Sequence, residues 1–286
     1  MRSHTNRVVL VVAIVSMMLL AVTLTAIVLD RRGGPCIPTH AQECACLATE
    51  DEPEVATEYS EAEFTHDGRT SPYRVYDSGI DPEQPVGLLI RLHGDGGYEF
   101  DEAQRFMACL AAQANSHNLI VVNPRTPSAD LTWWTEIRPN TAWLKSLHHF
   151  LLVDYPEIDK DSVWWMGYSG GAEIITYGLL PTETGIVSGG AIMIGGGGAP
   201  TWDADIVATP EQRRSLPLIW STGRYDTGDD PAADFDALTA ASRGSLFYRQ
   251  QGFQRVTMDF MREADHFTID QINVLADTLH RERKTD

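Results

Sequence analysis

Nearly continuous apolar runs alternate with segments of helical spacing from Tyr59 to the C-terminus. Runs that are apolar at almost every position are typical of strands buried on both faces of a parallel sheet. Apolar residues three or four positions apart are typical of helices that pack against such a sheet. The alternation therefore predicts an α/β fold with a mostly parallel central sheet and helices on both faces.

Periodicity and the turn residues between segments place the predicted elements along the chain. Strands are predicted over residues 59–68, 72–79, 86–94, 119–124, 162–169, 187–198, 216–223 and 255–261. Helices are predicted over residues 100–117, 140–155, 170–180, 232–242 and 268–283. Asp101 is expected to cap the first of these helices and Asp229 or Asp230 the fourth, because a carboxylate can accept hydrogen bonds from the unpaired amides of a helix start.

The N-terminal residues form a separate region. Val8–Leu29 contains no charged residue, glycine or proline, and a membrane-spanning helix needs about 20 apolar residues. This run is longer than a signal-peptide core of about 7–15 residues, and no clear Ala-x-Ala cleavage site follows it. We therefore predict a transmembrane signal anchor in residues 1–30, with a cleaved, secreted form as the alternative. Residues 31–58 are predicted to be an acidic linker and residues 59–286 the folded domain.

Charge and cysteine content restrict the partners and the compartment. The net charge of −18 repels phosphate backbones and argues against nucleic-acid binding. Cys36, Cys44, Cys46 and Cys109 could form disulfides in an exported domain, with Cys109 pinning the N-terminal segment, or they could be free thiols. Their spacing lacks the paired ligands of a zinc site, so no metal or cofactor is expected. The domain is therefore expected outside the cytoplasmic membrane.

The segment Gly167–Gly171 reads Gly-Tyr-Ser-Gly-Gly, between a predicted buried strand and a predicted helix. A serine on such a sharp turn takes a strained backbone conformation, and side chains two positions away on either side would collide. Glycine at both positions avoids the collision. Ser169 is therefore a candidate nucleophile at the carboxyl end of a parallel strand, where active sites of open sheets form. An ordinary tight turn would use the same residue types.

A serine hydroxyl is a weak nucleophile unless a base activates it. His266 follows the last predicted strand, on the sheet edge that carries Ser169, whereas the other downstream histidine lies in the terminal helix. His266 is therefore the candidate base. Asp226 closely follows the preceding strand and is the candidate acid that orients the imidazole, with Asp229 or Asp230 as the alternative.

The glycine-rich segment Arg91–Gly97 ends the first long predicted strand, on the same sheet edge. Its backbone N–H groups, with that of Gly170, could donate to the oxyanion formed when a serine attacks a carbonyl group. His93 lies within this segment and before the serine in the chain, so we expect it to orient the loop.

Tryptophans mark the segments that could form a substrate pocket. Trp133 and Trp134 follow a predicted strand on the edge that carries the serine, and Trp202 lies between the later strands. Each could wall a pocket for an acyl or sugar group. The alternative for Trp133 and Trp134 is a core role that anchors their loop.

The motifs HGDGG, GYSGG, GRYD and ADHF occur in this order and resemble those of the α/β-hydrolase superfamily, from about residue 59 to the C-terminus. The stretch YPEIDKDSVWWMGYSGGAE is similar to the polyhydroxybutyrate depolymerase and feruloyl-esterase-like group. The resemblance implies a catalytic triad of Ser169, Asp226 and His266. It implies oxyanion contacts near Gly94, Asp95 and Gly170.

Together these features predict a membrane-anchored, extracytoplasmic serine hydrolase that cleaves carboxylic esters through an acyl-enzyme. Its substrate would be a small-molecule or polymer ester, and it would need no cofactor or metal. An acyltransferase would use the same triad, and a serine peptidase is a further alternative. A different class of function is a catalytically silent hydrolase fold that serves as a cell-surface binding protein.

Overall fold

The computed structural model describes residues 59–200 and 206–283. The predicted anchor, the linker and Trp202 lie outside the described residues. Within the described ranges, no helix combines the length and the apolar character that crossing a membrane requires. Cys109 is disulfide-bonded.

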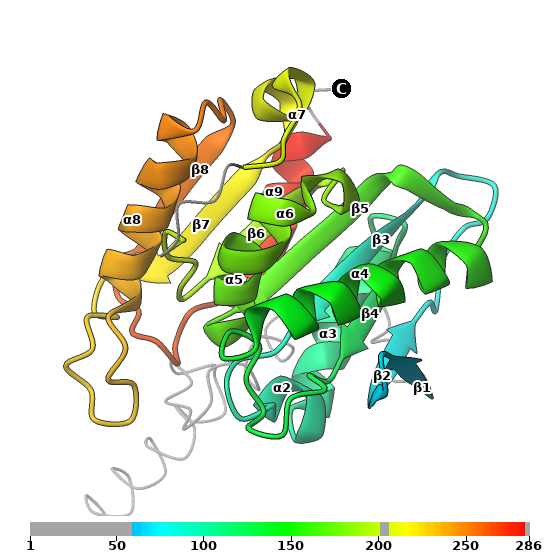
Figure 1. Cartoon of the computed structure of the whole chain (residues 1–286), viewed down its shortest axis with the longest axis horizontal. Helices are drawn as coiled ribbons and strands as arrows, with labels where there is room; N and C mark the ends of the chain where they lie inside the picture. The colour runs from blue at the N-terminus through cyan, green and yellow to red at the C-terminus, as the bar shows by residue number, and fades with distance from the viewer. Residues whose placement is uncertain (1–58, 201–205, 284–286) are drawn as a thin grey trace, which may run out of the picture. The chain divides into compact units, whose positions relative to one another are not determined.

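A sheet of 8 strands forms the centre of the domain, in the order β1-β2-β4-β3-β5-β6-β7-β8 (Figure 1). The strands are β1 Ser60–His66, β2 Arg69–Tyr76, β3 Val86–Leu92, β4 Leu119–Pro124, β5 Ile158–Tyr168, β6 Gly190–Ile194, β7 Leu218–Gly223 and β8 Val256–Met261. β1 pairs with β2, and β2 with β4, in antiparallel fashion. All other neighbours are parallel, so the predicted mostly parallel sheet is confirmed.

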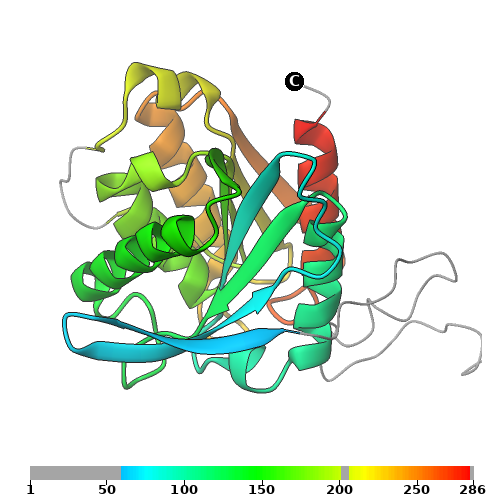
Figure 2. The same ribbon diagram turned by 90° about the vertical axis from the view of Figure 1, so that its right-hand side faces the viewer.

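Helices cover both faces of the sheet, as predicted. They are α2 Tyr98–Asp101, α3 Gln104–Asn115, α4 Ile137–Asp154, α5 Gly170–Ile174, the π-helix η3 Ile175–Leu179, α6 Leu180–Thr182, the 3-10 helix η4 Thr184–Ile186, α7 Pro210–Ser215, α8 Ala237–Gln250 and α9 Gln271–Glu282. Figure 2 shows α3 and α9 on one face of the sheet and α4, α5 and α8 on the other. Each face therefore has its own hydrophobic core.

The alternation of side chains along each strand feeds these two cores. On β5, Trp165 packs into the core beneath α4, whereas Trp164 and Met166 pack into the core beneath α3 and α9. Leu88 and Leu89 on β3 divide in the same way. Burial on both faces explains why the central strands are apolar at nearly every position.

The predicted helix over residues 100–117 is split into α2 and α3. Ala103 occupies the N-cap position of α3 and makes no side-chain cap. The expectation that Asp101 would cap this helix is wrong, because its carboxylate pairs with Arg125 at 3.1 Å.

The helix predicted over residues 232–242 begins later, at Ala237. Asp236 is its cap, since the carboxylate accepts a hydrogen bond from the Thr239 N–H at 2.9 Å. Asp229 and Asp230 therefore do not start this helix, and the residues before Asp236 form a loop instead.

Buried His148 on α4 makes stability depend on pH. Neither ring nitrogen has a hydrogen-bond partner among the described residues. Burial, and to a lesser extent His149, lowers the pKa of His148 to about 4. Because an unfolded histidine titrates at about pH 6.5, the stability that neutral His148 provides is complete above that pH. It is lost as the pH falls toward the folded-state pKa.

When the pH is lowered from about 8 to about 5, the unfolding free energy of His148→Leu should fall by about 2 kcal/mol less than that of the wild type. Urea denaturation at both pH values measures the difference. Val153→Ala, at an exposed position of the same helix, provides the control, because it removes no titratable group and should leave the pH dependence unchanged. Equal acid sensitivity of His148→Leu and the wild type would contradict this account.

Candidate active site

Ser169 lies on a strained turn between β5 and α5, with φ 50° and ψ −118°. A Cβ atom on Gly167 would lie 2.2 Å from the Gly171 carbonyl oxygen. A Cβ atom on Gly171 would lie 2.5 Å from the Leu92 carbonyl oxygen. The two glycines therefore let the turn pack against itself and against β3, which is the steric role that the sequence predicts for them.

The structure brings Ser169, His266 and Asp226 into one hydrogen-bonded chain. The His266 Nε2 atom lies 3.1 Å from the Ser169 Oγ atom. The His266 Nδ1 atom lies 3.0 Å from each carboxylate oxygen of Asp226. With the proton on Nδ1, the imidazole donates to Asp226 and leaves Nε2 to accept the serine hydroxyl proton. The carboxylates of the alternatives, Asp229 and Asp230, accept instead from the Thr227 hydroxyl and the Ala232 N–H.

Sheet topology accounts for this convergence. Ser169, Asp226 and His266 follow β5, β7 and β8, which run parallel and end at the same edge of the sheet. The Tyr168 hydroxyl donates to the His266 carbonyl oxygen at 2.8 Å and fixes the histidine loop to β5. Burial raises the pKa of Tyr168 well above its ordinary value, so this hydroxyl remains a donor.

Three N–H groups are predicted to contact the oxyanion. One of them already donates to a carboxylate, and the other two are available. The Gly94 N–H donates to the Glu99 carboxylate at 2.9 Å and is not available, so this expectation is corrected. The N–H groups of Asp95 and Gly170 have no acceptor within residues 59–200 and 206–283. These two amides are therefore the candidate donors to an oxyanion.

The Asp95 side chain covers Gly170 and is held by an indole. Trp134 Nε1–H donates to the Asp95 carboxylate at 2.9 and 3.2 Å from its two oxygens. A Cβ atom on Gly170 would lie 2.0 Å from Asp95 Oδ1, so a larger residue there would displace the Asp95 carboxylate. Burial raises the pKa of Asp95, whereas the indole hydrogen bond opposes that shift. Trp134 thus fixes the segment that carries one of the open amides.

Trp133 does not wall a pocket. Its side chain is 0% exposed and packs in the core, where its ring centroid lies 5.0 Å from that of His93. The alternative, an anchor for its loop, is the arrangement observed. Trp134 is 42% exposed and is the member of the pair that reaches the sheet edge of the serine.

His93 joins the glycine-rich segment to the loop after β4. Its Nδ1 atom lies 2.6 Å from the Gly94 carbonyl oxygen, and its Nε2 atom accepts from the Thr126 N–H at 2.9 Å. Burial lowers the pKa of His93 to about 4, so the ring stays neutral and can donate on one side while it accepts on the other. The geometry agrees with the loop-orienting role expected for this histidine.

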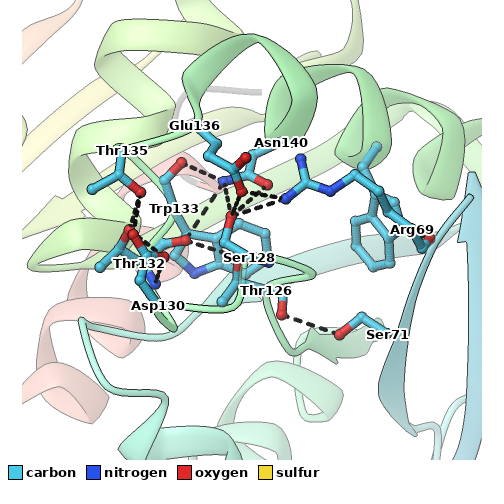
Figure 3. A network of polar contacts seen from close by, with 11 residues as sticks. Arg69, Ser71, Thr126, Ser128, Asp130, Thr132, Trp133, Thr135, Glu136 and Asn140 are labelled. Atoms are coloured by element: carbon cyan, nitrogen blue, oxygen red, sulfur yellow. Dashed lines mark hydrogen bonds and ion pairs between the residues drawn. The ribbon is translucent and has the colours of Figure 1, made fainter. Parts of the chain in front are cut away.

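A polar network that the sequence does not reveal holds the loop between β4 and α4 (Figure 3). Buried Asn140 donates to the Trp133 carbonyl oxygen at 2.7 Å and to Ser128 at 3.0 Å. Ser128 in turn bonds Glu136 at 2.8 Å, and Arg69 pairs with Glu136 at 2.6 Å. The loop that supports Trp134 is therefore rigid, although its polar residues look like ordinary loop composition.

Glu173, four residues after the serine, holds the glycine-rich loop that follows β6. Its two carboxylate oxygens accept from the N–H groups of Gly197 and Gly198 at 3.0 Å each. A Cβ atom on Gly196 would lie 3.1 Å from the Ser169 carbonyl oxygen, so this loop lies against the turn at Ser169. Burial raises the pKa of Glu173, against the effect of these hydrogen bonds and one from Tyr177.

Ser169 opens on a cavity of about 430 Å³. Its lining residues are Gly94, Asp95, Tyr98, Glu99, Tyr168, Ser169, Ala232, Ala233, Asp234, Phe235, His266 and Phe267. Residues 232–235, in the loop before α8, supply one wall of this cavity. A larger groove, about 1110 Å³, lies beside α4 and does not include Ser169 or His266.

Comparison with solved structures identifies similar folds. No protein-family model matches the sequence, and no curated protein sequence matches it either. A thermostable esterase is 19% identical with a TM-score of 0.58, over 79% of this chain and 64% of that one. A thermophilic carboxylesterase from a metagenomic library is 14% identical with a TM-score of 0.54, over 84% and 93%. A ferulic acid esterase is 14% identical with a TM-score of 0.56, over 79% and 97%.

The match therefore spans less than two thirds of the thermostable esterase. At these identities the likeness concerns the fold. These three neighbours are esterases, and the fold of this chain is similar to theirs. The chain has the α/β-hydrolase fold.

Proposed function

We propose that this protein is a serine hydrolase that cleaves carboxylic esters through a Ser169–His266–Asp226 triad. The observation that carries the proposal is the hydrogen-bonded chain from Asp226 through His266 to Ser169, which opens on a cavity. Esterases among the structural neighbours add support for ester hydrolysis in general.

The geometry supports a two-step reaction. Ser169 Oγ attacks the ester carbonyl carbon while His266 Nε2 takes the hydroxyl proton, and the imidazolium then returns that proton to the leaving alcohol. Water next attacks the acyl-serine, with His266 again as base, and the carboxylic acid leaves. Asp226 is 2% exposed and holds the imidazole in the tautomer that both steps need.

The developing oxyanion would be stabilised by the N–H groups of Asp95 and Gly170. Each such donor typically contributes about 3 kcal/mol to the transition state. The Gly170 amide begins α5, so the unpaired end of the helix also faces the reacting centre.

We propose, in addition, that Val8–Leu29 anchors the enzyme in the cytoplasmic membrane with the catalytic domain on the outer side. The support is the uncharged apolar run and the disulfide bond at Cys109, since disulfides persist in oxidising compartments. A secreted form after cleavage is the alternative.

Ser169→Ala should abolish labelling by a fluorophosphonate probe and lower kcat/KM for p-nitrophenyl acetate by about 10⁴-fold or more, because the nucleophile is lost. In-gel fluorescence and p-nitrophenol release measure the two effects. Ser242→Ala, at an exposed serine on α8, should behave as the wild type. Equal labelling of Ser169→Ala and the wild type would refute the proposed function.

Trp134→Phe should lower kcat by about 10-fold and change KM less, because removal of the indole donor displaces an amide that acts only in the transition state. Steady-state kinetics with p-nitrophenyl acetate separates the two constants. Tyr225→Phe, at another exposed aromatic residue, is the control. A change confined to KM would instead assign Trp134 to substrate binding.

Protease added to intact cells should degrade the catalytic domain, and cell fractionation should recover the full-length chain in the membrane pellet. Lysed cells provide the control for protease sensitivity. A domain protected in intact cells would contradict the proposed orientation. A shortened, freely released chain would establish the secreted alternative.

A further inference from the structure

The wall of the catalytic cavity is acidic. Asp95, Glu99 and Asp234 line it, whereas no lysine or arginine is among the described residues that do so. Asp95 belongs to the glycine-rich segment after β3, and Asp234 belongs to the loop before α8. A charged substrate group would therefore meet carboxylates from two separate segments.

Glu99 is the buried member of this set and is 2% exposed. One of its carboxylate oxygens accepts from the Gly94 N–H, and the other accepts no hydrogen bond from residues 59–200 and 206–283. Glu99 also forms no ion pair within those ranges. A carboxylate in the wall of a cavity attracts a donor or a cation that enters the cavity.

The buried guanidinium of Arg91 does not neutralise this wall. Its NH groups donate to the Leu92 carbonyl oxygen and, at 2.6 Å, to the Gln271 side chain. Its charge interacts with Glu99 at a distance, without a salt bridge. Against this one cation stand Glu99, Asp95 and Asp234, so the cavity keeps a net negative charge while His266 is neutral.

Aromatic rings complete the cavity. Phe235 and Phe267 are 38% and 37% exposed, and both line it together with Tyr98 and Tyr168. Aromatic faces attract cations through their quadrupole, with the strongest effect for weakly hydrated ammonium groups. The same carboxylates would repel a substrate that carries a carboxylate or phosphate.

We propose that the preferred substrates are esters with a positively charged ammonium group close to the scissile bond, and that Glu99 is the residue that recognises the charge. This inference rests on the proposed esterase function. Asp234 and Asp95 add attraction at the cavity mouth, and the aromatic rings provide contact surface. Anionic esters are excluded by the same charges.

The test compares acetylthiocholine with 3,3-dimethylbutyl thioacetate, which has the same shape and a carbon atom in place of the ammonium nitrogen. Cleavage of the C–S bond releases a thiol from either compound, so one thiol assay follows both. We expect kcat/KM to be about 10-fold higher for the cationic thioester at low salt, and the ratio to fall as salt screens the cavity charge.

Variants identify the recognising group. Glu99→Gln keeps an acceptor for the Gly94 N–H but removes the charge. It should reduce the ratio of kcat/KM for the cationic thioester to kcat/KM for the neutral one at least about 5-fold. Asp234→Asn should reduce it about 2-fold, because exposed charges are screened. Asp277→Asn makes the same change in net charge at an exposed site on α9, and should leave the ratio unchanged.

The outcomes separate this inference from the proposed function. Wild-type enzyme that hydrolyses p-nitrophenyl acetate but prefers the neutral thioester, or cleaves neither thioester, overturns the inference alone. A cation preference that survives in Glu99→Gln with a wild-type melting temperature removes Glu99 from recognition. Failure to hydrolyse p-nitrophenyl acetate overturns the proposed function together with the inference.

Discussion

The strained turn at Ser169 is the constraint on which the rest of the site depends. Its backbone conformation is unfavourable for a residue with a side chain, and the surrounding structure must compensate. Compensation comes from close packing of Gly167 and Gly171 against neighbouring backbone, which no larger residue permits. The turn places the Ser169 hydroxyl oxygen 3.1 Å from His266 Nε2. The parallel strands serve as the rigid platform.

Buried polar groups extend that platform outward from the turn. Glu173 ties the loop after β6 to α5, and neutral His93 ties the glycine-rich segment to the loop after β4. Trp134 then fixes Asp95 above Gly170. Each contact joins segments that are distant in the sequence. The sheet edge that carries Ser169 is thus formed by loops that contain little secondary structure and are joined to one another by hydrogen bonds.

The difference between local rules and long-range contacts explains which features of the site could be predicted from the sequence. The Gly-Tyr-Ser-Gly-Gly turn follows a local steric rule, and the positions of Asp226 and His266 follow from strand order, so both could be expected. The occupied Gly94 amide and the core position of Trp133 depend on long-range packing that leaves no periodic signal. The late start of α8 has a local reason, because several aspartates compete to cap it and only the geometry selects Asp236.

The second property of the site is the negative charge of the cavity wall. A cavity lined by Asp95, Glu99 and Asp234 lies beside Ser169, the proposed nucleophile, whose attack would place negative charge on the substrate. The open amides of Asp95 and Gly170 offset that charge locally. A cationic substrate would offset it further, so the features that bind the substrate would also favour the transition state.

The most direct test of the central claim is to identify the acylated residue. Wild-type protein and His266→Ala would be mixed with p-nitrophenyl acetate, quenched in acid during turnover, digested and analysed by mass spectrometry. The account predicts one acetyl group on the wild-type peptide that contains Ser169, and its loss in His266→Ala, where the base is missing. Ester hydrolysis with the acetyl group on another residue, or with wild-type and His266→Ala acetylated equally, would contradict it.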